Sequence, residues 1–129
     1  MQVVVAAAIC RGGRLLVAQR AHPAEIRGLW ELPGGKLEPD EQELAALGRE
    51  CREELGVELE IGDRVGSDVL IKDGWILRAY AARLHSGEPK PLEHLELRWT
   101  AADELSALPW VPANAALLPD LCELLRAAA

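Results

Sequence analysis

The chain has 129 residues, half of them hydrophobic, and a formal net charge of −7. This length is typical of one domain with one core, so we expect residues 1–129 to form a single domain. No apolar run approaches the roughly 18 residues of a membrane span, which argues against a membrane protein. The acidic balance argues against binding to polymeric nucleic acid, which usually needs a basic patch. Three scattered cysteines without a C-x-x-C motif favour a reducing cytoplasm.

The first part of the chain predicts strands. Residues 2–9 and 14–20 are β-like runs joined by Arg11-Gly12-Gly13, which predicts a hairpin. The apolar opening has no basic residues before it and no convincing cleavage site after it, so we interpret it as a buried strand rather than a secretory signal. A polar loop and a short segment at 29–32 lead to Pro33-Gly34-Gly35, whose glycines would allow close approach of the backbone to phosphate or metal.

A helix is predicted from about residue 41 to residue 55. Asp40 followed by Glu43 forms a plausible N-cap with a capping box, and Gly56 is a natural stop. Four apolar residues recur at helical spacing and predict a face packed on the core: Leu44, Leu47, Cys51 and Leu55.

Beyond this helix, Gly, Asp and Pro signals separate further elements. We expect strands at 57–61, 65–71, 75–84 and 95–99. Thr100 could cap a short helix that ends at Ala107. A final helix is expected over 113–127, or from Pro119 onward. Strands mixed with helices in this way predict an α/β fold.

Three carboxylates share a second face of the helix at 41–55. Glu50, Glu53 and Glu54 are spaced i, i+3, i+4, and each like-charged pair at this spacing costs about 0.2–0.5 kcal/mol in an isolated helix. One interpretation is a solvated face with Arg49 and Arg52 as counter-ions. The other is a cation site, for which carboxylate oxygens favour Mg2+ or Mn2+.

A long motif decides between these interpretations. Residues 35–57 fit Gly-x5-Glu-x7-Arg-Glu-U-x-Glu-Glu-x-Gly-U at every fixed position, where U is a bulky apolar residue. Cys51 fills the first U position, where a buried thiol can act as a small hydrophobe. By this motif the chain resembles the Nudix hydrolases, and the resemblance implies an α/β/α sandwich with a mixed β-sheet.

Further runs resemble the MutT-like nucleoside triphosphate pyrophosphohydrolases, including those that act on CTP or dCTP. These enzymes cut between the α and β phosphates and release a nucleoside monophosphate and pyrophosphate. The resemblance therefore implies nucleotide pool sanitation, acting on (d)CTP or modified cytosine nucleotides, on 8-oxo-dGTP, or on both. The runs that carry it are residues 16–20 and 28–39, Glu93-His94 ahead of Trp99, and Pro112-Ala113-Asn114.

The resemblance also implies roles for residues of the motif. Arg49 would orient the neighbouring carboxylates, and Glu41 would brace the loop and the helix. Glu50 is in addition the first candidate for the general base. The Mg2+ or Mn2+ ions would be held by the carbonyl of Gly34 and the carboxylates of Glu50, Glu53 and Glu54.

The candidate substrate contacts are Arg20, Lys36, Asn114 and Trp30. Arg20 resembles a phosphate-contacting position, with a solvated strand end as the alternative. Asn114 could read a base edge, because an amide both donates and accepts, or it could cap the final helix. Trp30 could stack on a base or pack in the core. Lys36 directly follows the two glycines.

Some assignments stay open. An acidic residue outside the motif often acts as ligand or base in this family, and Glu93 and Glu96 are the candidates. The three histidines show no ligand spacing and receive no role. Other functions to weigh are hydrolysis of another diphosphate-linked compound, such as a nucleotide sugar or a dinucleotide, and a non-catalytic nucleotide sensor. We expect a monomer with a small nucleotide substrate.

Overall fold

A mixed β-sheet lies between helices in the computed structural model, which describes residues 1–128. The elements are, in chain order, β1 (Gln2–Arg11), β2 (Arg14–Gln19), the 3-10 helix η1 (Ala24–Ile26), β3 (Trp30–Glu31), β4 (Gly34–Lys36), α1 (Glu43–Leu55), β5 (Glu58–Lys72), β6 (Trp75–Ser86), β7 (Glu96–Ala101), the 3-10 helix η2 (Ala102–Ala107), α2 (Pro112–Ala115) and α3 (Leu118–Ala128).

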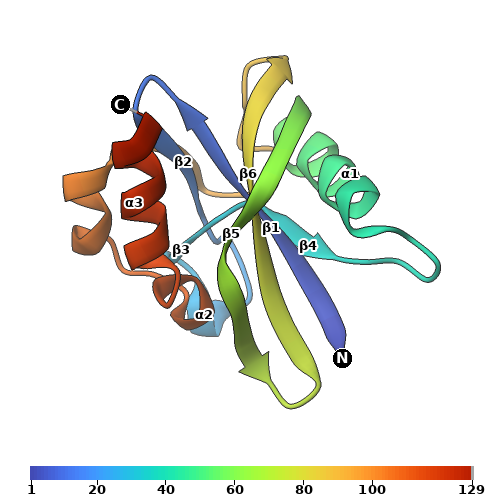
Figure 1. Ribbon diagram of the computed structural model, residues 1–129. Coiled ribbons are helices and arrows are strands. Elements are labelled where there is room, and N and C mark those ends of the chain that lie inside the picture. Colours follow the sequence, from blue (N-terminus) through green and yellow to red (C-terminus); the bar gives the residue numbers. More distant parts are fainter. Residues whose placement is uncertain (129) are drawn as a thin grey trace.

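The sheet has the strand order β3-β2-β1-β6-β5, while β4 also pairs with β1 and β7 with β2. The β1–β6 pair is parallel, and the other strand pairs are antiparallel. Figure 1 shows α1 on one side of the strands and α3 on the other. The predicted α/β/α sandwich with a mixed sheet is confirmed.

The central strand β1 serves both layers of the core. Val5, Ala7 and Ile9 pack in the cluster that contains the buried face of α1, whereas Ala6 and Ala8 pack in the cluster that contains α3. This division follows from the alternation of side chains along a strand. The prediction that the apolar opening is a buried strand is therefore confirmed.

The predicted hairpin between β1 and β2 is also confirmed. Arg11 pairs with Arg14 across the turn. Gly12 and Gly13 have φ angles of +58° and +74°, and a two-residue type I′ turn requires positive φ at both positions. Glycine adopts these angles without steric cost.

Helix α1 begins two residues later than predicted. Its N-cap is Gln42, whose side chain makes no capping hydrogen bond, and Asp40 lies in a turn with φ +64°. The predicted cap at Asp40 is wrong, because the left-handed turn places it outside the helix start. Glu43 does not complete a capping box; its carboxylate instead accepts hydrogen bonds from Arg78 Nη1 and the Tyr80 hydroxyl, both at 2.7 Å.

The rest of α1 follows the predicted pattern with one exception. Gly56 ends the helix in the left-handed conformation, with φ +70°. Leu47, Cys51 and Leu55 are fully buried, but Leu44 is 48% exposed. Leu44 lies in the first turn of α1 and lines an open surface cavity. Ala46 is buried instead of Leu44 in this part of the helix.

The second half of the chain differs from the prediction in three places. The segments 57–61 and 65–71 form one strand, β5, which continues past Gly62 through shifts in its register with β6. Thr100 lies inside β7 and caps no helix; Glu104 instead accepts a hydrogen bond from the Ala101 N–H at the start of η2. The final helix is divided into α2 and α3, with Pro119 in the first turn of α3.

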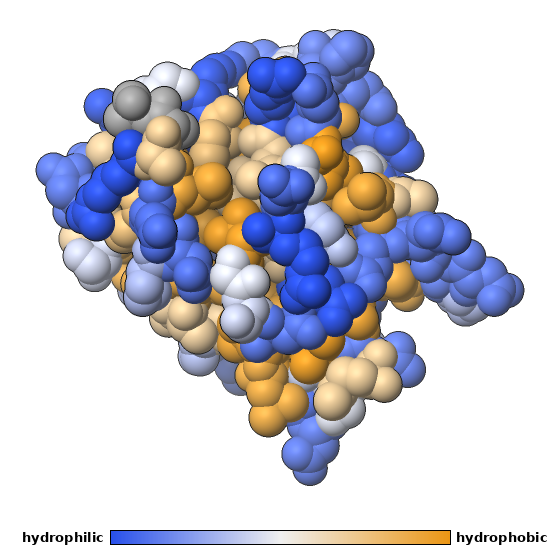
Figure 2. All heavy atoms as spheres, viewed as in Figure 1, coloured by the Kyte–Doolittle hydropathy of each residue, from blue (hydrophilic) through white to orange (hydrophobic). Residues whose placement is uncertain are grey.

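The surface of the molecule is mixed in polarity. Figure 2 shows apolar atoms between α3 and β5, next to the hydrophilic side chains of β5. Within residues 1–128, no helix has both the length and the hydropathy needed to cross a membrane.

Candidate functional site

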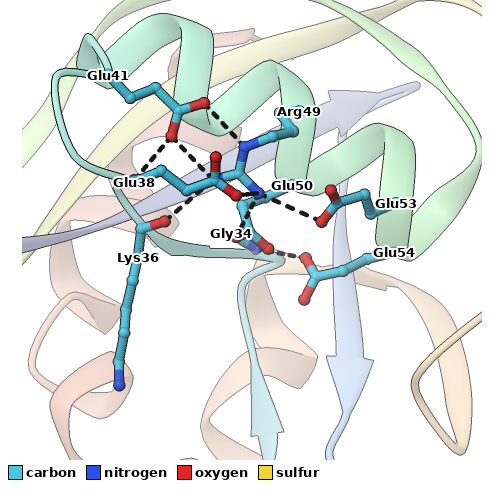
Figure 3. Close-up of polar contacts among 8 residues, drawn as sticks. All are labelled: Gly34, Lys36, Glu38, Glu41, Arg49, Glu50, Glu53 and Glu54. Atoms are coloured by element: carbon cyan, nitrogen blue, oxygen red, sulfur yellow. Dashed lines mark hydrogen bonds and ion pairs between the residues drawn. The ribbon is translucent and has the colours of Figure 1, made fainter.

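The carboxylates of α1 lie beside β4, the short strand that precedes the helix (Figure 3). Glu54 is only 6% exposed, and its Oε2 accepts a hydrogen bond of 2.9 Å from the backbone N–H of Gly34. Burial raises the pKa of Glu54 to about 9, and the neighbouring charges of Glu31, Glu50 and Glu93 add to the rise against the opposing effect of the Gly34 N–H.

Glu50 lies against the backbone of Gly35. A Cβ atom added to Gly35 would be 2.5 Å from the carboxyl carbon of Glu50, so only glycine leaves room for this side chain. Burial raises the pKa of Glu50, and hydrogen bonding and charge attraction from Arg49 partly offset that rise. Glu53 is the most exposed of the three carboxylates, with 54% of its side chain accessible.

Arg49 connects the helix to the loop before it. Its Nε and Nη2 donate to the two oxygens of Glu41 at 2.8 and 2.9 Å, and its Nη1 donates to Glu50 at 3.0 Å and Glu53 at 3.3 Å. Nη2 also donates to the carbonyl oxygen of Lys36. The hydrogen bonds from Arg49 lower the pKa of Glu41 to about 2. One guanidinium therefore orients three carboxylates and contacts the end of β4.

The carboxylates suit a divalent cation by their chemistry. A buried carboxyl with a pKa of about 9 is protonated at pH 7 unless a positive charge stabilises its ionised form. Arg49 contacts Glu50 and Glu53, but none of its hydrogen bonds reaches Glu54. In the described part of the chain, no three His, Cys, Asp or Glu side chains are already gathered as a metal centre. A hard cation, which prefers oxygen ligands, would supply this positive charge.

A cavity of about 210 Å³ lies next to β4. Its wall is mostly apolar, with polar groups from Arg20, Glu31, Lys36 and Asn114. Gly34 and Gly35 also line it, so the cavity reaches the strand that contacts the carboxylates. An apolar cavity with a few polar groups is the usual form of a small-molecule site.

Asn114 is 6% exposed and lies within α2. Its Oδ1 accepts a hydrogen bond of 2.9 Å from the Leu32 N–H. Val111 is the N-cap of α2, so the alternative interpretation of Asn114 as a helix cap is wrong. With its oxygen held by Leu32, the amide has its Nδ2 donor for the cavity.

Arg20 and Lys36 line the cavity in different ways. The guanidinium of Arg20 donates to Glu31 at 3.2 Å and to the carbonyl oxygen of His22 at 2.8 Å, which does not fit a freely solvated strand end. The ammonium group of Lys36 lies 4.9 Å from the centre of the Trp75 ring. Figure 3 shows that the Lys36 side chain runs away from the carboxylates.

Trp30 does not lie in the cavity. It is 3% exposed and belongs to the core cluster that contains α3, and the guanidinium of Arg98 covers its ring at 4.7 Å from the centre. The predicted stacking role of Trp30 is contradicted, because neither face of the ring is free. The alternative interpretation, core packing, fits this position.

His94, which received no role from the sequence, and Glu93, whose role stayed open, both lie at the site. His94, with 4% of its side chain exposed, has its Nε2 at 3.0 Å from Glu31 Oε2. A small cavity of about 40 Å³ joins His94 and Glu93 to Glu54 and Arg20. Glu96 instead forms an exposed ion pair with Arg98. Of the two acidic candidates outside the motif, Glu93 is therefore the one near the carboxylates.

Comparison with known proteins agrees with this geometry. A family model described as NUDIX domain matches residues 1–121. The chain is 49% identical over 131 residues to a Mycobacterium tuberculosis protein named "Putative 8-oxo-dGTP diphosphatase 2", covering 99% of this chain and 93% of that protein. It is 42% identical over 117 residues to the CTP pyrophosphohydrolase of Escherichia coli K12, covering 89% and 87%.

Solved structures show the same fold. The solution structure of the E. coli ORF135 protein matches with a TM-score of 0.82 and 42% identity, over 99% of this chain and 92% of that one. The crystal structure of a MutT NUDIX hydrolase from Burkholderia pseudomallei matches with a TM-score of 0.79 and 36% identity, over 92% and 96%.

Proposed function

Because the chain belongs to the Nudix hydrolase family, we propose that it is a nucleoside triphosphate pyrophosphohydrolase. It cuts between the α and β phosphates of its substrate. The substrates are (d)CTP or modified cytosine nucleotides, 8-oxo-dGTP, or both, and the biological role is nucleotide pool sanitation. The observation that carries this proposal is the contact of the buried Glu54 and the partly buried Glu50 with Gly34 and Gly35, which line a mostly apolar cavity that has a few polar groups. The names of the mycobacterial and E. coli relatives support the substrate class.

Nudix hydrolases need a divalent metal, and Mg2+ or Mn2+ is the ion that we propose here. Its ligands would be the oxygens of Glu50, Glu53 and Glu54 and the carbonyl of Gly34. When bound, the ion neutralises phosphate oxygens that gain charge during the reaction. The buried Glu54, whose ionised form lacks a contact with Arg49, supports a cation at this place.

Glu50 is the proposed general base. It takes a proton from the water that attacks phosphorus, while the bond from that phosphorus to its leaving group breaks. The products are a nucleoside monophosphate and pyrophosphate. A pKa raised by burial makes Glu50 a better proton acceptor than a solvated glutamate. Arg49 holds the carboxylate in place, and Glu41 fixes the guanidinium from the other side.

The cavity binds the rest of the nucleotide. Arg20 and Lys36 supply positive charge for phosphate oxygens, and Asn114 offers its Nδ2 to an acceptor on the base. We further propose one domain over residues 1–129, a monomer and a cytoplasmic location. The free thiols of Cys10, Cys51 and Cys122 support the last of these, because thiols stay reduced in the cytoplasm.

The test is Mg2+-dependent release of nucleoside monophosphate and pyrophosphate from CTP, dCTP, 5-methyl-dCTP, 8-oxo-dGTP and the ordinary triphosphates. Glu50→Gln should reduce kcat by a factor of about 100 or more. Glu88→Gln is the matched control, because Glu88 is an exposed carboxylate paired with Arg11. Its rate should equal that of the wild type.

Other outcomes would point to the alternatives. Turnover of a nucleotide sugar or a dinucleotide, with no triphosphate hydrolysed, would replace the proposed substrate class with another diphosphate-linked compound. Nucleotide binding without turnover of any of these compounds would indicate a sensor.

A further inference from the structure

We propose that Glu31 selects the base of the substrate by accepting a hydrogen bond from an exocyclic amino group. Cytosine and guanine carry such a group, whereas uracil and thymine do not. This inference rests on the proposed function insofar as the ligand of the cavity is a nucleotide. It assigns Glu31 as the residue that determines base specificity.

The position of Glu31 follows from the short strand β3. Its neighbours Trp30 and Leu32 are each 3% exposed and pack in the core. Since side chains alternate along a strand, Glu31 points to the opposite face. There it lines the cavity of about 210 Å³ together with Asn114.

Two partners hold the Glu31 carboxylate in a fixed direction. Arg20 Nη1 donates to its Oε2 at 3.2 Å, and His94 Nε2 lies 3.0 Å from the same oxygen. The carboxylate is 13% exposed. A carboxylate has about four acceptor positions, so these two partners leave acceptor capacity for a ligand.

Asn114 completes the pattern. Its oxygen accepts from the N–H of Leu32, the residue after Glu31, so the amide offers a donor in the same cavity as the Glu31 acceptor. Cytosine can donate from its amino group to Glu31 and accept at its adjacent ring nitrogen from Asn114. Guanine can donate from its ring N–H and its amino group together to the two carboxylate oxygens.

Uracil and thymine fit this arrangement poorly. Their one ring N–H is flanked by a carbonyl oxygen on each side, and these oxygens would face the negative carboxylate. A site built around a hydrogen bond discriminates strongly against a base that leaves it unmade. The relatives named for CTP and for 8-oxo-dGTP share substrates that carry an amino group.

The experiment measures base preference by binding and by turnover. Calorimetric titration with dCMP and dUMP needs no hydrolysis, and kcat/KM is measured for dCTP and dUTP. The wild type should prefer the cytosine ligand by roughly tenfold or more in both. Glu31→Gln should reduce this preference at least about tenfold, because the amide can donate to the uracil carbonyl. The matched control Glu88→Gln should retain it.

A wild type that binds dUMP as tightly as dCMP would overturn the proposal, and so would a folded Glu31→Gln variant with an unchanged preference. A second comparison, dGMP against the inosine analogue that lacks the amino group, needs no variant and should show the same order. Preference for dCMP without hydrolysis of any triphosphate would refute the proposed function but leave the role of Glu31 standing.

Discussion

The backbone N–H of Gly34 donates a hydrogen bond of 2.9 Å to the carboxylate of Glu54, twenty residues further along the chain. This contact joins the start of β4 to the last turn of α1. The accepting carboxyl group is 6% exposed, so the contact lies in a largely buried place. The protonation of Glu54 should therefore contribute to the pH dependence of stability.

The metal-free protein should lose stability as the pH rises from 5 to 9. Glu54 has a pKa of about 9 in the folded state against an ordinary value of 4.5, so the folded state binds the extra proton between these values. The contribution of this proton to the free energy of unfolding is complete below pH 4.5 and is lost as the pH rises through 9. Since each pH unit of pKa difference corresponds to about 1.4 kcal/mol, the loss is on the order of a few kcal/mol.

Thermal unfolding in the presence of a chelator checks this. Tm should fall from pH 5 to pH 9 in the wild type and much less in Glu54→Gln. Added Mg2+ should raise Tm most at pH 9, the end of this range where a proton competes least with the cation for the carboxylate. A wild-type Tm that rises over this pH range would contradict the prediction.

Alanine at the two glycines of β4 should have different effects, one on activity and the other on stability. In Gly35→Ala the new Cβ displaces the Glu50 carboxylate, a flexible side-chain end, so kcat should fall at least about tenfold with little change in Tm. In Gly34→Ala the Cβ would overlap with the carbonyl oxygen of Val5 in β1, and unfolding should become easier by about 1–3 kcal/mol. Denaturant titration and initial rates separate the two; equal losses of stability would contradict this division.

Arg49→Lys should lower activity although the charge is retained. A lysine has no planar fork, so it cannot bind both oxygens of Glu41 and still reach Glu50. Activity should fall about 10–100-fold, as is typical when a residue that orients metal ligands is changed. Arg83→Lys is the control, because Arg83 forms an exposed pair with Glu60. Initial rates over a range of Mg2+ concentrations make the measurement, and an unchanged rate for Arg49→Lys would exclude the orienting role.

The sequence predicts most of the fold because its signals are local. Glycines with positive φ mark the hairpin at Gly12-Gly13 and the end of α1 at Gly56, and the apolar spacing of Leu47, Cys51 and Leu55 reveals the buried face. The predicted start of α1 was wrong because Asp is a residue type that often caps helices, whereas the backbone of Asp40 adopts a left-handed turn conformation. No local pattern distinguishes these two states.

The site was predicted less completely, because some of its contacts join distant segments. His94 and Glu31 are 63 residues apart in the chain, so no spacing within either segment indicates their contact. The sequence left stacking and core packing both open for Trp30 for a related reason. Strand β3 has two residues, which is too short for an alternating pattern to show which side chain is buried.

Asn114 should separate stability from substrate affinity. In Asn114→Ala the buried N–H of Leu32 loses its acceptor, and the free energy of unfolding should fall by about 1–3 kcal/mol. Asn114→Asp keeps an oxygen for that N–H but replaces the Nδ2 donor with a negatively charged oxygen in the nucleotide cavity. KM for dCTP should then rise about tenfold or more while Tm falls less than in the alanine variant. Unchanged KM in a folded Asn114→Asp variant would show that the amide faces no substrate atom.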